Sequence, residues 1–191
     1  DYIFGDWDDL KVLSVNHNVM ADLVLNHVSS SHPWVHQFIN CNEPGFSYIV
    51  TSKKSDIWNN VIRPRSSSLF TSIKTIDGLK DVWTTFGPDQ IDVDWKNPNI
   101  ILEYLRLLVR YVECGAFWIR LDAIAFIWKE ANSTCLHLDQ VHKIVKVLNI
   151  CLKFIKPSGV LITETNVPEK ENLSYLVEGD EANIAYNFTL P

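Results

Sequence analysis

The chain has 191 residues, 47% of them hydrophobic, which suffices for one domain with a sizeable core. A formal net charge of −6, without any Lys/Arg-rich stripe carrying interleaved aromatics, argues against a nucleic-acid partner. No apolar run approaches the ~20 residues that a bilayer span needs, and no positively charged leader is visible, so we expect a globular protein with no membrane partner and no export signal.

The first predicted elements are a helix and a buried strand. Residues 7–15 have the pattern of a helix, with Asp6 as its cap. Residues 20–25 (MADLVL) form a mostly apolar run that is closed by the polar Asn26 and His27. This pattern fits a strand that is buried on both faces and whose carboxyl end meets a polar site.

Residues 29–97 lack a regular pattern. Prolines and a serine tract interrupt this segment, and only residues 34–39 suggest a short helix. Aromatic side chains recur along it, which favours a folded excursion over a disordered one. We therefore predict a small inserted subdomain.

Regular alternation resumes after residue 97. Asn97-Pro98 opens a helix that ends at Gly115. The chain continues with a strand over residues 116–121, a helix over 137–156, a strand over 160–163 and a strand over 186–190. Such alternation predicts an α/β fold with a parallel sheet and right-handed crossovers.

Three of these strands end in ionisable groups: Asp22 with His27, Arg120 with Asp122, and Glu164. The carboxyl ends of strands in a parallel barrel converge on one mouth, which is where such folds place catalysis. A single carboxylate after a strand is more often a cap or a loop anion. Arg120 and Asp122, however, share one face of their strand, where the cation can hold the carboxylate ionised.

Two carboxylates facing each other across a pocket are what cleavage of a glycosidic bond requires. Asp122, beside Arg120, fits the ionised nucleophile. Glu164 lies between Thr163 and Thr165, and we expect these surroundings to keep it protonated as the acid. The residues therefore predict a sugar-processing enzyme, retaining if the carboxyl groups lie about 5.5 Å apart.

The segments around these residues resemble the conserved regions of the α-amylase superfamily, glycoside hydrolase family 13. DLVLNH (22–27) resembles the first region, IRLDA (119–123) the second and ITETNV (162–167) the third. QIDVD (90–94) resembles a further region near the end of the inserted domain. NHVSSSHPW, VIRPRSSSLF and RLDAIAFIWKE are closer still to the sucrose phosphorylase subfamily, in the branch with glucosylglycerate phosphorylase.

This resemblance implies a partial TIM (β/α)8 barrel with strands 3 to 6 of the family fold. Residues 1–40 would start the barrel fragment, 41–96 would form the inserted subdomain, and 97–191 would continue the barrel. A closed barrel needs about 250 residues, and the fourth motif, with its third catalytic Asp, has no counterpart. We therefore expect the chain alone to be insoluble or inactive.

For function, the resemblance implies double displacement with retention. Asp122 would form the glucosyl ester, and Glu164 would protonate the departing oxygen and then activate phosphate or water. Arg120 would orient Asp122, His27 would bond the glucose, and Asp22 would support Arg120. The expected reaction is phosphorolysis of a small α-glucoside of the sucrose or glucosylglycerate type. Inorganic phosphate is then the co-substrate, and we expect no cofactor and no metal.

Several alternatives stay open. The chain could be a hydrolase of the same superfamily, or an inactive remnant that only binds sugar. Asp22 could simply satisfy backbone groups, and His27 could be a buried neutral histidine. Arg63 and Arg65 are either phosphate contacts or surface charges. Four cysteines without CxxC spacing signal neither a zinc site nor a disulfide framework, so we expect reduced thiols and a cytoplasmic location.

Overall fold

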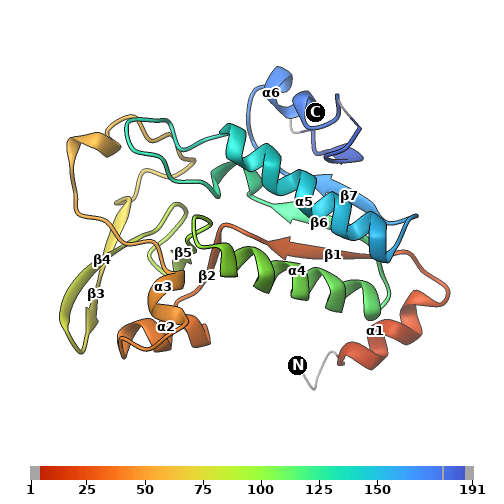
Figure 1. Cartoon of the computed structure of the whole chain (residues 1–191), viewed down its shortest axis with the longest axis horizontal. Coiled ribbons are helices and arrows are strands. Elements are labelled where there is room, and N and C mark those ends of the chain that lie inside the picture. Colours follow the sequence, from red (N-terminus) through yellow and green to blue (C-terminus); the bar gives the residue numbers. More distant parts are fainter. Residues whose placement is uncertain (1–4, 178, 188–191) are drawn as a thin grey trace.

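The computed structural model describes residues 5–177 and 179–187, and a four-stranded parallel sheet lies at its centre. Figure 1 shows α4 and α5 running side by side against this sheet. The arrangement confirms the predicted α/β alternation. In spatial order, the sheet contains β1 (Val19–Val24), β6 (Ala116–Asp122), β7 (Val160–Thr163) and β8 (Ile184–Ala185), and the two helices are α4 (Pro98–Glu113) and α5 (Asp139–Ile155).

The helices begin where capping chemistry allows. The Asp6 side chain accepts hydrogen bonds from the first-turn backbone of α1 (Trp7–Ser14), in a capping box. The Asn97 side chain caps α4 by accepting a hydrogen bond from the Asn99 backbone N–H. The helix α5 begins two residues later than predicted, because His137 has a φ of 54° and Leu138 is extended. Neither conformation can belong to a right-handed helix.

The core lies between the sheet and its two helices. The side chains that pack there are fully buried, and each buried Leu or Ile side chain contributes about 1.5–3 kcal/mol. The sheet supplies Leu23, Ile119, Leu121 and Leu161, α4 supplies Ile100 and Leu108, and α5 supplies Val145 and Leu148. This packing fixes the positions of the strand ends, and therefore of the polar residues that follow them.

The segment between β1 and α4 lies beyond the carboxyl end of β1 (Figure 1). It contains a hairpin that the sequence reading missed, in which the chain turns back at Gly78 with a φ of 115°. In this segment β2 also pairs with β5 in antiparallel fashion, in a two-stranded sheet of their own. Its elements are β2 (His27–Ser29), α2 (Pro33–Ile39), α3 (Gly45–Tyr48), a 3-10 turn (Asp56–Trp58), β3 (Phe70–Thr75), β4 (Gly78–Trp83) and β5 (Gln90–Asp92).

After β6 come a 3-10 turn (Ile124–Phe126) and α5, and after β7 comes α6 (Glu169–Ser174). The last strand, predicted over 186–190, is instead β8, and residues 188–190 lie outside the described chain. The Asn183 side chain accepts a hydrogen bond from the Leu161 backbone N–H at 2.8 Å, which aligns this earlier segment with β7. No helix in the described ranges has both the length and the apolar character needed to span a membrane.

Candidate active site

The register of the sheet brings the predicted polar residues to one end. Asp22 of β1 lies beside Arg120 of β6, and Val24 lies beside Asp122. Glu164 follows the last residue of β7, and its backbone N–H donates to the Leu121 carbonyl at 3.1 Å. The strand ends therefore converge as the sequence predicted.

One guanidinium links three carboxylates at this end of the sheet. Arg120 Nη1 donates to Asp22 Oδ1 at 2.7 Å and to Asp122 Oδ1 at 3.0 Å. Arg120 Nη2 lies 3.9 Å from Glu164 Oε2. Burial acts to lower the pKa of Arg120, but the hydrogen bond to Asp22 and the charges of all three carboxylates outweigh it, so the pKa is raised. The cation is therefore permanent, and the cluster keeps an excess of acidic groups.

The hydrogen bond that holds the Glu164 carboxylate comes from Ala123 and not from Thr163 or Thr165, its neighbours in the sequence. Its Oε2 accepts a hydrogen bond from the Ala123 backbone N–H at 2.9 Å. Ala123 has a φ of 52°, a left-handed conformation directly after β6. The Thr165 hydroxyl donates to Asn172 instead, and the buried Thr163 hydroxyl has no hydrogen-bond partner. The contacts that position the Glu164 carboxylate thus come from the end of β6.

His27 approaches the same site from β2. Its Nε2 lies 2.8 Å from the side-chain amide nitrogen of Gln90, and its ring packs 5.3 Å from that of Phe86. Burial lowers the pKa of His27, and the negative charges of Asp92 and Asp122 only partly oppose this effect. The imidazole is therefore neutral near pH 7, and it can both donate and accept a hydrogen bond.

Two residues of the site region were missed by the sequence reading. The centroid of the Tyr186 ring lies 5.5 Å from the Arg120 guanidinium carbon, so the ring contacts the cation of the cluster. Lys129, from the quoted segment RLDAIAFIWKE, is buried and forms an ion pair with Asp92. The signal for the Lys129–Asp92 pair was an aspartate between two apolar residues, Ile91 and Val93, because a buried carboxylate needs a partner.

The two arginines considered as anion contacts have different surroundings. Arg63 Nη1 donates to the backbone carbonyls of Thr84 and Thr85 at 3.4 and 3.3 Å, within the segment between β1 and α4. Arg65 is exposed. These observations do not test whether either arginine binds phosphate, and that role stays a prediction. Across the described ranges, no cluster of three or more His, Cys, Asp or Glu side chains is arranged to hold a metal ion.

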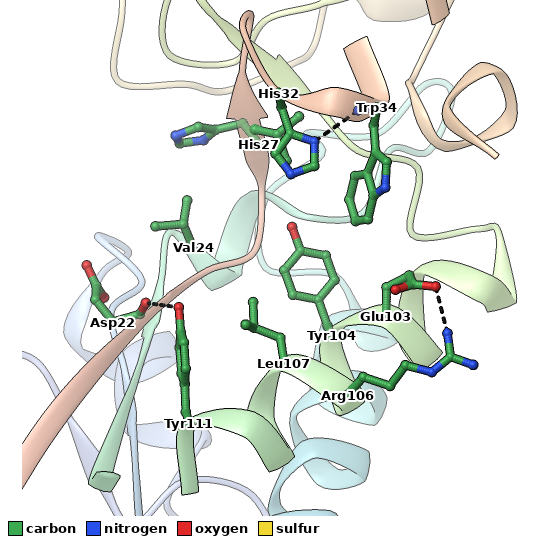
Figure 2. A pocket seen from close by; sticks show the side chains of 11 residues that line it. Asp22, Val24, His27, His32, Trp34, Glu103, Tyr104, Arg106, Leu107 and Tyr111 are labelled. Atoms are coloured by element: carbon green, nitrogen blue, oxygen red, sulfur yellow. Dashed lines mark hydrogen bonds and ion pairs between the residues drawn. The ribbon is translucent and has the colours of Figure 1, made fainter. Parts of the chain in front are cut away.

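A cavity of about 490 Å³ opens on the free side of β1, next to α4. Its wall is largely apolar and includes Trp34, Tyr104 and Leu107. Figure 2 shows that the side chains of Asp22, on β1, and of His27, on β2, project to the opposite side of the chain from these three residues. The cavity is therefore separate from the carboxylate cluster, although Asp22 and His27 border both.

Comparison with known proteins identifies the family of this chain. The family model described as alpha amylase, catalytic domain, matches residues 1–191. The glucosylglycerate phosphorylase of Allomeiothermus silvanus is 43% identical over 188 residues, which cover 98% of this chain and 34% of that protein. The sucrose phosphorylase of Agrobacterium vitis is 31% identical over 149 residues, covering 72% of this chain and 30% of that protein. The chain therefore spans about a third of the length of these curated relatives.

Solved structures give the same fold. The sucrose 6F-phosphate phosphorylase from Thermoanaerobacter thermosaccharolyticum superposes with a TM-score of 0.85 at 19% sequence identity. The match covers 97% of this chain and 40% of that one. At this identity the likeness concerns the fold alone, and it agrees with the parallel sheet and its flanking helices.

Proposed function

Since this chain belongs to the alpha-amylase catalytic-domain family, we propose that it is the part of a retaining α-glucoside phosphorylase that carries the nucleophile and the acid/base. The observation that carries the proposal is the contact of one guanidinium, that of Arg120, with both Asp122 and Glu164. Such a pair of carboxylates around one anomeric carbon is what retaining glycosyl transfer requires.

In the first step, an Asp122 carboxylate oxygen attacks the anomeric carbon while the bond to the departing oxygen breaks. Glu164 donates its proton to that oxygen. In the second step, a phosphate oxygen attacks the same carbon, the ester bond to Asp122 breaks, and Glu164 takes the proton from phosphate. Arg120 orients Asp122 throughout, and its permanent charge compensates the carboxylate that is restored when the ester breaks.

The substrate we propose is a small α-glucoside of the glucosylglycerate type. Three glucosylglycerate phosphorylases are 38–43% identical to this chain, whereas two sucrose phosphorylases are 25–31% identical. His27 would hydrogen-bond the glucosyl unit, and Asp22 would hold Arg120 in place. Hydrolysis by water at the second step is the alternative, and it differs only in which acceptor reaches the glucosyl ester.

We propose that the sheet is strands 3 to 6 of a (β/α)8 barrel, with residues 41–96 as its inserted subdomain. Support comes from the relatives' length and from β1, which has a sheet neighbour on one side only in the described chain. The cavity on the free side of β1 has an apolar lining, against which another barrel strand and its helix would pack.

We propose that the reaction needs neither a cofactor nor a metal ion, only inorganic phosphate. The buried oxygens of Asn26 and Asp92 already face a cation, because the Lys129 ammonium lies 2.9 and 2.7 Å from them. A cytoplasmic location is proposed as well. It is supported by the four cysteines, which are all free thiols.

The test is labelling with α-glucosyl fluoride, whose leaving group needs no acid, followed by mass spectrometry. We expect one glucosyl adduct on the peptide with Asp122, none in D122N, and accumulation in E164Q because ester breakdown lacks its base. Phosphate added to the labelled protein should release glucose 1-phosphate, whereas release of glucose would indicate the hydrolase. If the unsubstituted chain forms no adduct, the sugar-binding remnant becomes the better reading.

A further inference from the structure

A second charged cluster lies behind His27, deeper than the three carboxylates. Lys129 Nζ lies 2.7 Å from Asp92 Oδ2, and the two side chains are 7% and 0% exposed. An isolated charge at such depth would cost several kcal/mol, so each group depends on the other. The pair takes no part in the proposed reaction.

The hydrogen-bond partners of the ammonium are all oxygens, and its Nζ also lies 5.6 Å from the centroid of the Trp83 ring. Besides Asp92, it donates to Asn26 Oδ1 at 2.9 Å, to the Phe126 carbonyl, and more weakly to the Thr85 hydroxyl at 3.5 Å. Asp92 also accepts from the backbone N–H and the hydroxyl of Thr85, at 3.0 and 2.5 Å. The three N–H donors of the ammonium and the carboxylate oxygens therefore all have partners.

These contacts join three segments that are distant in the chain. Asn26 follows β1, Asp92 ends β5, and Lys129 follows the turn after β6. His27 sits at the junction, because it follows Asn26 and pairs with Asp92 in the β2–β5 register. The Val93 N–H also donates to the Asn26 carbonyl at 3.1 Å. Whatever holds Asn26 and Asp92 in place therefore holds His27.

We propose that Lys129 is a positioning residue whose ammonium locks the end of β1 and β5 onto the segment after β6, and thereby fixes the His27 imidazole beside Asp122. Lysine suits this role because its long stem reaches the cluster and its head bonds three acceptors at once. The inference does not depend on the reaction proposed above.

Electrostatics at His27 supply a readout that packing alone would not change. The negative charges of Asp92, Asp122 and Asp89 raise the pKa of His27, and the positive charge of Lys129 lowers it. Loss of the ammonium alone should therefore raise the pKa of His27. Loss of both Lys129 and Asp92 charges should lower it slightly, because Asp92 has the larger effect of the two.

The experiment compares K129M, D92N/K129M and the control K143M in the full chain, since Lys143 is an exposed lysine of α5. K129M leaves Asp92 buried and unpaired, so Tm should fall by roughly 10 °C or more. D92N/K129M removes both charges, so it should regain most of that loss. K143M should have the Tm and the His27 pKa of the unsubstituted chain. The pKa of His27, followed by NMR of its imidazole, should rise in K129M and fall in the double variant.

The proposal is overturned if K129M keeps the Tm and His27 pKa of K143M. It is also overturned if the double variant loses as much Tm as K129M, because the lysine stem would then matter only through packing. If K129M fails to fold, the double variant decides alone: a folded protein with a lowered His27 pKa supports the lock, and a protein that is also unfolded refutes it.

Discussion

Two cation-centred clusters lie close together in this molecule, and they use the same chemistry differently. At the Arg120 cluster, one guanidinium meets three carboxylates, and the side chains are between 16% and 50% exposed. At the Lys129 cluster, one ammonium meets one carboxylate in nearly complete burial. A balanced, buried pair can only hold segments together. An accessible cluster with excess carboxylates can attack, donate protons and bind a ligand.

The largest expected effect tests whether Arg120 is the organising group of the open cluster. R120M removes the only cation that contacts Asp122 among the described residues, so glucosyl labelling of Asp122 should slow by about 10²–10³-fold. The rate is measured by mass spectrometry. R106M is the matched control, because Arg106 pairs with Glu103 on the surface of α4. Equal labelling rates in the two variants would show that Arg120 has no role in forming the glucosyl ester.

A pH titration tests the role of three partly buried histidines. Burial lowers the folded-state pKa of His27, His32 and His137 below 6.5, so the unfolded chain binds more protons as pH falls. The free energy of unfolding should therefore decrease as pH drops from about 7.5 to about 5.5, and H27Q should flatten this slope. Denaturant unfolding at several pH values measures it. An unchanged slope in H27Q would mean that His27 is not held neutral by its surroundings.

Added salt should change the Tm deficit of a variant in the Arg120 cluster but not that of a variant in the Lys129 cluster. The Asp22 side chain is half exposed, so D22N should lower Tm by only about 1–4 °C, and about 1 M NaCl should erase this difference. The deficit of K129M should survive the same salt, because water and ions do not reach the buried pair. Thermal melts at low and high salt make the comparison. A salt-sensitive K129M deficit would show that the junction opens to solvent.

The smallest expected effect concerns metal ions. With the Lys129 ammonium in contact with Asn26 and Asp92, a chelator should leave Tm unchanged, and added Ca²⁺ should not raise it. Differential scanning calorimetry checks both conditions. A rise in Tm with Ca²⁺ would locate a cation site that the proposed function omits.

The sequence predicted those parts of the site that depend on strand alternation. Arg120 and Asp122 are two residues apart on one strand, so their shared face followed from a period of two. The same rule explains why Thr163 and Thr165 do not hold the Glu164 carboxylate, because neighbours in an extended chain project to the opposite side. The protonated state expected for Glu164 stays a prediction. The left-handed Ala123, which donates to Glu164, left no trace in the sequence because non-glycine residues seldom adopt that conformation.

Contacts between residues far apart in the sequence were the other limit on what the sequence could predict. Lys129 and Asn26 lie 103 positions apart, and nothing local to WKE indicates that its lysine turns inward. The β3–β4 hairpin, in contrast, was readable from Asp77-Gly78, a turn pair flanked by strand-forming residues. The last strand was predicted to begin at residue 186, two residues later than β8 does. A side-chain contact of Asn183 aligns β8 with β7, and no periodic pattern reveals such a contact.

The parallel pairing of β1 with β6 determines when the site can form. Asp22 and Arg120 are bonded across 98 positions, and the Asn26–Lys129 contact spans 103. Local elements such as the β3–β4 hairpin can fold early, whereas these contacts must wait until the chain has been synthesised beyond residue 129. The cluster that would perform the chemistry is thus among the last parts of the described chain to assemble, and the exposed β1 strand must stay unpaired until then.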